Sequence, residues 1–156
     1  MNYITIHENL SKDIREILKE YYSIDFLNAQ ISLNTIANNN RVFLIKTKEG
    51  KYILRESSSS KSLDHLQLEV KVLTYLHEKD FSLTPFITPN VTGNPITIYK
   101  KKYYILENFL PGTVKKNVNN LVDFNERKQE DLFSALAEFT RASEDFECSI
   151  PKNNQT

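Results

Sequence analysis

Hydrophobic positions recur at helical spacing in three segments of the chain. The first predicts a helix of about three turns over residues 10–21, with Ser11 and Asp13 capping and charging its first turn. The second is the strongest, over about residues 62–78, and its apolar stripe consists of Leu63, Leu66, Val70, Leu73 and Leu76. The third runs over about residues 126–143. Its expected inward-facing side chains are Leu132, Phe133, Leu136 and Phe139.

Between these helices the pattern changes to short runs rich in strand-forming residues. It predicts five strands, at about residues 31–35, 41–47, 52–55, 96–99 and 103–107. The first three form an antiparallel meander, and the last two form a hairpin with Lys100, Lys101 and Lys102 at its exposed tip. Gly50 is expected to supply a positive φ in the turn between the second and third strands.

These elements predict an α+β fold. We expect a five-stranded antiparallel sheet whose apolar face is packed by the long central helix, with an N-terminal helix and a C-terminal helix beside it. The segments would be an N-terminal helix over residues 1–25, the sheet-bearing lobe over 26–109, and a linker with a final helix over 110–156.

Composition narrows the classes of function. The chain has 156 residues, 40% of them hydrophobic, which suits one domain with a core of its own. Lys and Arg number 20 and so do Asp and Glu, and this balance argues against nucleic acid or an anionic membrane as the main partner. The single Cys148 cannot form an internal disulfide. Without an apolar run near 18 residues or a signal-like start, we expect a cytoplasmic protein.

Three features in order suit a site that handles phosphate. Such a site needs a turn over the phosphates, a cation on a strand and a carboxylate on a packed helix that holds the cation in place. Asn39 and Asn40 lie at the tip of the first hairpin, Arg55 ends the third strand, and Glu69 lies in the middle of the long helix. Arg55 and Glu69 can then pair across the interface between strand and helix. The alternative is that both are ordinary charged residues at the surface.

A further segment suits a hinge that binds a nucleotide base through its backbone. Leu106, Glu107, Asn108 and Phe109 end the last strand and are followed by Leu-Pro-Gly at residues 110–112. Backbone N–H and C=O groups at such a position can hydrogen-bond to the edge of a purine.

The order and spacing of these pieces resemble the amino-terminal lobe of the aminoglycoside phosphotransferase family, which includes type II homoserine kinases and choline-kinase-like enzymes. The pieces are residues 39–45, 52–56, 68–70 and 104–112, and the resemblance covers about residues 28–143. It implies ATP or GTP with magnesium, and transfer of a phosphoryl group to a hydroxyl of a small molecule.

By matched position, the resemblance gives each residue a role. Arg55 would contact phosphate with Glu69 as its partner, Asn39 and Asn40 would lie in the phosphate loop, and the hinge would be formed by Leu106, Glu107, Asn108 and Phe109.

The chain also departs from the family pattern. The first hairpin lacks glycines, and Thr140 stands where a His is common. None of the three histidines, His7, His65 and His77, begins a His-x-Asp catalytic loop, so we predict no catalytic residue and no metal ligand. Residues 122–125 (Val-Asp-Phe-Asn) imitate the metal-binding Asp-Phe segment, but they precede the last helix and are interpreted as a linker.

Two hypotheses of function therefore remain, with one alternative for the fold. The chain is the nucleotide-binding lobe of a small-molecule phosphotransferase without its catalytic lobe, or it is a non-catalytic interaction module of the same fold. In both, its exposed face would meet a carboxy-terminal lobe or another protein chain. The third interpretation is an unrelated α+β domain, in which Arg55 and Glu69 would not be neighbours.

Overall fold

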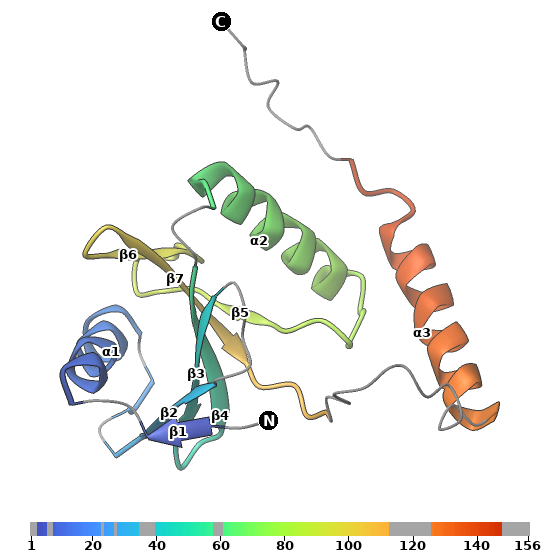
Figure 1. The fold of residues 1–156 in the computed structure, drawn as a ribbon. Helices are drawn as coiled ribbons and strands as arrows, with labels where there is room; N and C mark the ends of the chain where they lie inside the picture. The colour runs from blue at the N-terminus through green and yellow to red at the C-terminus, as the bar shows by residue number, and fades with distance from the viewer. Residues whose placement is uncertain are drawn as a thin grey trace, which may run out of the picture.

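The computed structural model describes residues 3–5, 8–22, 24–26, 28–34, 40–57, 61–112 and 126–147. In this part of the chain, an antiparallel sheet lies between two helices, and a third helix lies to one side (Figure 1). The strands are β1 (Tyr3–Thr5), β2 (Gln30–Asn34), β3 (Arg41–Lys46), β4 (Lys51–Glu56), β5 (Ile87–Thr88), β6 (Thr97–Tyr99) and β7 (Lys102–Asn108). The helices are α1 (Glu8–Tyr21), α2 (Leu63–Glu78) and α3 (Glu126–Ser143).

The sheet has the order β1-β2-β3-β4-β7-β5, with β6 also paired to β7, and every pairing is antiparallel. This confirms the α+β class and all five predicted strands. The predicted number of strands was too low, because β1 and β5 were not foreseen. They are only three and two residues long, and β6, which is as short as β1, was predicted through its hairpin with β7.

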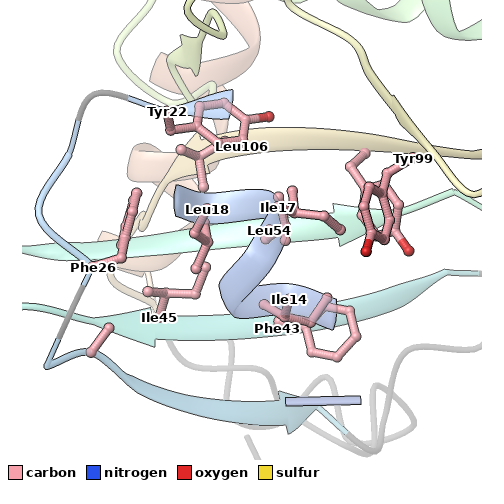
Figure 2. Packing of buried hydrophobic residues seen from close by; sticks show 12 residues of the cluster. Ile14, Ile17, Leu18, Tyr22, Phe26, Phe43, Ile45, Leu54, Tyr99 and Leu106 are labelled. Carbon is pink, nitrogen blue, oxygen red and sulfur yellow. The ribbon is translucent and has the colours of Figure 1, made fainter. Parts of the chain in front are cut away.

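The larger hydrophobic core lies between α1 and one face of the sheet. Ile14, Ile17 and Leu18 are fully buried on α1. They pack in one cluster with strand residues that include Phe43 and Leu54 (Figure 2). Every second residue of a strand faces the same way, so this face holds one of the two alternating sets of β3, β4 and β7.

The long helix α2 packs on the opposite face, as predicted. Ser62 is its N-cap, and the Ser62 side chain accepts a hydrogen bond from the His65 N–H. From the predicted apolar stripe, Leu66 and Val70 are buried against strand residues such as Ile105. The sheet is thus covered on both sides, whereas the sequence pattern pointed to the long helix alone.

Two local predictions were wrong. α1 begins at Glu8, so Ser11 and Asp13 lie within the helix rather than at its cap. Gly50 has no positive φ. The turn there is instead held by Thr47, whose hydroxyl oxygen accepts hydrogen bonds from the N–H groups of Glu49 and Gly50. Positive φ occurs at Lys100 and Lys101, in the turn between β6 and β7.

The prediction for α3 was correct in extent and wrong in orientation. Its four large apolar side chains, expected to face inward, are 43% to 66% exposed: Leu132, Phe133, Leu136 and Phe139. α3 contacts the rest of the molecule near its C-terminal end, where Ala142 is buried with Leu76 and Phe81. The apolar pattern marked a face that stays largely exposed, although Phe139 at its end packs edge-on against the ring of Phe81.

Candidate functional site

Arg55 lies on the face of the sheet that carries α2. The register of the strands places it opposite Val42 of β3 and Ile105 of β7. Ile53, two residues earlier, shares this face, and Leu54 points into the core under α1. β4 therefore presents a cation and an apolar side chain, side by side, on the face away from α1.

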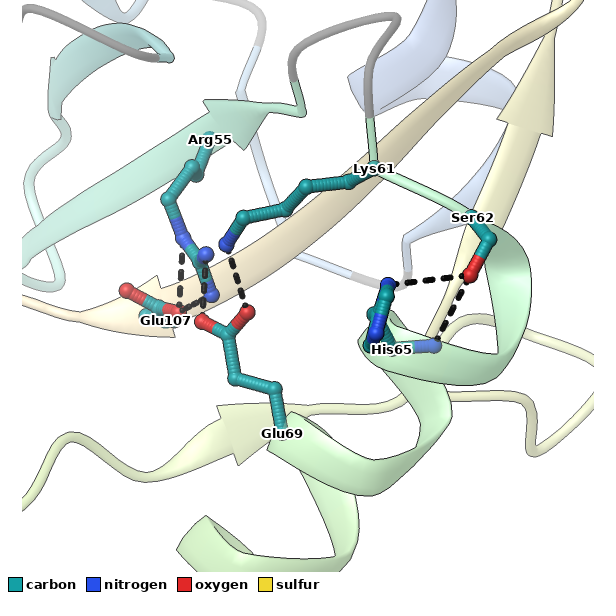
Figure 3. Close-up of polar contacts among 6 residues, drawn as sticks. All are labelled: Arg55, Lys61, Ser62, His65, Glu69 and Glu107. Carbon is teal, nitrogen blue, oxygen red and sulfur yellow. Dashed lines mark hydrogen bonds and ion pairs between the residues drawn. The ribbon is translucent and has the colours of Figure 1, made fainter. Parts of the chain in front are cut away.

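The guanidinium of Arg55 is held by two carboxylates from different elements (Figure 3). Its Nη1 lies 2.5 Å from Oε1 of Glu69 on α2. Its Nε and Nη2 both donate to Oε1 of Glu107 on β7, at 3.2 and 2.6 Å. Burial acts to lower the pKa of Arg55, but the charges of Glu107 and Glu69 outweigh it and raise that pKa above its usual value.

Glu69 also pairs with Lys61, which precedes α2. The Lys61 Nζ donates to Oε2 of Glu69 at 3.0 Å. Burial acts to raise the pKa of Glu69, but the hydrogen bond from Lys61 and the charges of Arg55 and Lys61 prevail, and the pKa is lowered. The cluster thus contains two basic and two acidic side chains in alternation: Lys61, Glu69, Arg55 and Glu107.

Arg55 retains capacity to bind an anion. A guanidinium has five N–H donors. Glu107 takes one from Nε and one from Nη2, and Glu69 takes one from Nη1. Among the described residues, these contacts account for three of the five donors, so two N–H groups on the terminal nitrogens remain for an anion such as phosphate.

The predicted hinge residues divide between the two faces of the sheet. Leu106 is fully buried in the core under α1, whereas Glu107 lies with Arg55. The N–H groups of Asn108 and Phe109 donate to the carbonyls of Phe86 and Lys51, at 3.0 and 3.1 Å. These two N–H groups are therefore used in hydrogen bonds within the fold and are not available to a nucleotide base.

The side chain of Asn108 accepts a hydrogen bond in place of its backbone carbonyl. Its Oδ1 accepts the Phe86 N–H at 2.5 Å, the position at which a backbone carbonyl accepts in an ordinary antiparallel ladder. The Phe86 N–H thus bonds to the side chain of Asn108 and not to its backbone carbonyl.

Of the other predicted residues, Asn40 is partly buried and immediately precedes β3. Asn39, Cys148 and residues 122–125 lie outside the described residues. The structure brings Arg55, Glu69 and Glu107 together.

Sequence reasoning missed Lys61 and the two apolar neighbours of Arg55, Val42 and Ile53. The alternation of side chains along β4 could have placed Ile53 on the same face as Arg55. Lys61 precedes the helix, so helical spacing could not place it beside Glu69.

The described residues contain no group of three or more His, Cys, Asp or Glu side chains placed to hold a metal ion. Glu69 and Glu107, the two carboxylates of the site, are already paired with cations, so this cluster does not suit magnesium. No helix in the described part of the chain is long and apolar enough to cross a membrane.

Comparison with known proteins identifies the fold. No protein-family model and no curated protein matches the sequence. Among solved structures, a spectinomycin phosphotransferase in complex with ADP and spectinomycin aligns over 90% of this chain, with a TM-score of 0.63 and 16% identity. An amicoumacin kinase in complex with AMP-PNP and Ca²⁺ aligns over 94%, with a TM-score of 0.65 and 15% identity. The chain has the fold of the amino-terminal lobe of aminoglycoside phosphotransferase-like kinases.

This kinase-lobe fold confirms the structural part of the resemblance drawn from the sequence. The chain spans 38% and 45% of the lengths of the two matched proteins. The alternative of an unrelated α+β domain, in which Arg55 and Glu69 would be apart, is wrong.

Proposed function

We propose that this chain is the nucleotide-binding lobe of an ATP- or GTP-dependent kinase that phosphorylates a hydroxyl of a small molecule. The observation that carries the proposal is the placement of Arg55. It is fixed by Glu69 and Glu107 and keeps two N–H donors for a phosphate. Phosphoryl transfer depends on this kind of positioned cation.

The surroundings of Arg55 suit the remainder of a nucleotide. Val42 and Ile53 are partly buried apolar side chains on the same face, and a flat base can pack on them. The Asn108 carbonyl and the Leu110 N–H would then contact the edge of the base, in place of the Asn108 and Phe109 N–H groups first expected. The matched structures contain ADP and AMP-PNP, which supports a nucleotide as the ligand.

The catalytic base and the metal ligands are proposed to belong to a second lobe. A magnesium ion bound there would neutralise phosphate charge. The cluster of Arg55, Lys61, Glu69 and Glu107 has as many acidic as basic side chains, so it would position a triphosphate without supplying an excess of positive charge. On this proposal the isolated chain binds nucleotide weakly and does not catalyse transfer.

The test is calorimetric titration of the chain with ATP and with GTP, each with magnesium. We compare the wild type with Arg55→Met and with Lys48→Met, an exposed lysine in the β3–β4 turn. We expect the Arg55 variant to bind about tenfold more weakly or worse, as for loss of a charge-assisted contact, and the Lys48 variant to match the wild type. Equal heats from the wild type and a folded Arg55→Met would remove Arg55 from the site.

A second candidate, an interaction module, is favoured by α3. The four exposed side chains Leu132, Phe133, Leu136 and Phe139 lie on a helix that contacts the rest of the molecule mainly near its C-terminal end (Figure 1). An exposed apolar face of this kind marks a surface that binds protein.

Light scattering over a range of concentrations tests this candidate, with Leu136→Glu as the variant and Glu138→Gln as its control. Association that the Leu136 variant abolishes supports a protein partner. A chain that stays monomeric and binds no nucleotide contradicts both candidates.

A further inference from the structure

We propose that Glu107, carried by the sheet, is the positioning residue of Arg55, and that Arg55 keeps its place without Glu69. This deepens the proposed function and rests on it only for the nucleotide measurement below. The inference concerns which of two carboxylates determines the orientation of the guanidinium.

The pairing of β4 with β7 brings Glu107 next to Arg55. Arg55 lies opposite Ile105, and Glu107 lies opposite Ile53, so Arg55 and Glu107 are diagonal neighbours on one face of adjacent, hydrogen-bonded strands. Their separation is therefore set by the backbone ladder between β4 and β7. Glu107 receives two hydrogen bonds from Arg55, one of them from Nε, which is the nitrogen nearest the backbone. Both bonds converge on Oε1 of Glu107, so they direct the Nε–Nη2 edge of the guanidinium toward β7.

Glu69 is the more exposed of the two partners, although its single contact with Arg55 is short. Its side chain is 30% exposed, compared with 10% for Glu107, so solvent screens its interaction with Arg55 more strongly. It makes one contact with Arg55, through Nη1, and its other oxygen is taken by Lys61. It also lies on α2, which packs on the sheet through side chains such as Leu66 and Val70 rather than through a backbone ladder.

A movement of α2 would therefore separate Glu69 from Arg55 while both bonds to Glu107 persist. Lys61 would remain as the partner of Glu69 after such a movement, since it lies directly before the helix. The cation for phosphate is thus in place whether or not the helix is docked. In this lobe, a change in the position of α2 therefore does not change the orientation of Arg55.

The test is a nuclear magnetic resonance measurement of the Arg55 Nε–H signal in the full chain without ligand. We compare the wild type, Glu107→Gln, Glu69→Gln and Glu78→Gln, the last an exposed control on α2. We expect Glu107→Gln to move or broaden the signal, and both Glu69→Gln and Glu78→Gln to leave it in place. Backbone amide spectra show which variants are folded.

The Glu69 variant keeps the proposal falsifiable even if Glu107→Gln fails to fold. A folded Glu69→Gln that loses the Nε–H signal overturns the inference, as does a folded Glu107→Gln that keeps it. A retained signal in Glu69→Gln supports it.

Titration with AMP-PNP and magnesium then separates this inference from the proposed function. If the wild type binds, we expect Glu107→Gln to weaken binding by about tenfold and Glu69→Gln to weaken it less. The opposite order overturns the inference. A wild type that binds no nucleotide contradicts the proposed function, while the resonance measurement still decides the role of Glu107.

Discussion

The hydroxyl of Tyr22, just after α1, lies 3.1 Å from the hydroxyl of Thr97 in β6. Thr97 also accepts a hydrogen bond from the side-chain amide of Asn90, at 3.2 Å. The three side chains are all buried, Thr97 being only 1% exposed. A short polar chain thus joins the end of α1 to the segment that leads into β6, inside an otherwise apolar core.

Removal of one hydroxyl from this series of hydrogen-bonded side chains should destabilise the fold. The loss should be larger when the removed hydroxyl leaves more partners unpaired. Tyr22→Phe removes one hydrogen bond and should lower the free energy of unfolding by about 1 kcal/mol. Thr97→Val deprives both Tyr22 and Asn90 of a partner and should lower it by about 2 kcal/mol or more. Urea unfolding measures both, with Tyr21→Phe as a half-buried control. Equal effects of the two variants would contradict this account.

Features that depend on residues within one segment were predicted from the sequence, whereas features that depend on distant segments were not. The helices α1, α2 and α3 and five of the seven strands in the described part of the chain follow from patterns within each segment. The exposure of Phe133 does not, because an apolar pattern indicates a face that will be covered without indicating what covers it.

The same distinction applies to the site. Arg55 and Glu69 were predicted to pair because a phosphate site needs a carboxylate on the packed helix to hold the cation of the strand, and the structure brings them together. The contact between Arg55 and Glu107 joins residues 52 positions apart and depends on the register of β4 against β7. Register depends on the packing of the whole sheet, so a local pattern could not identify Glu107 as a partner of Arg55.

Loss of the Arg55 cation should destabilise the lobe in a way that depends on pH. In Arg55→Met, the carboxylates of Glu69 and Glu107 face each other without the guanidinium, and we expect a loss of about 3 kcal/mol at pH 7. Acid protonates the carboxylates and relieves their repulsion, so the difference from the wild type should shrink as the pH falls. Urea unfolding at pH 7 and at acidic pH measures this change. A difference that stays constant with pH would show that the charges are not its cause.

The lowered pKa of Glu69 makes a separate prediction about acid stability. A carboxylate with a depressed folded-state pKa stabilises the protein fully above its unfolded-state value, near 4.5. This contribution is lost as the pH falls through the lower folded-state value. The wild type should therefore be more stable than Glu69→Gln at pH 7, and the two should converge in strong acid. Glu78→Gln, which changes an exposed residue of the same helix, should track the wild type throughout.

The attachment of α3 should depend on a small number of aromatic contacts near its C-terminal end. The rings of Tyr75 and Phe146 are 5.0 Å apart at 60°, and those of Phe81 and Phe139 are 5.7 Å apart at 66°. The ammonium of Lys71 also lies 5.7 Å from the ring of Phe146. Edge-to-face pairs contribute about 1 kcal/mol beyond the area they bury.

Phe146→Ala should therefore release α3 locally without unfolding the sheet. We expect amide hydrogens of α3 to exchange about tenfold faster in this variant, since a loss of about 1.4 kcal/mol changes an opening equilibrium tenfold. Amides of β4 and β7 should exchange at the wild-type rate. Phe133→Ala, which removes a ring that is 66% exposed, is the matched control and should leave exchange in both regions unchanged. Faster exchange in the strands as well would show that α3 and the sheet unfold as one unit.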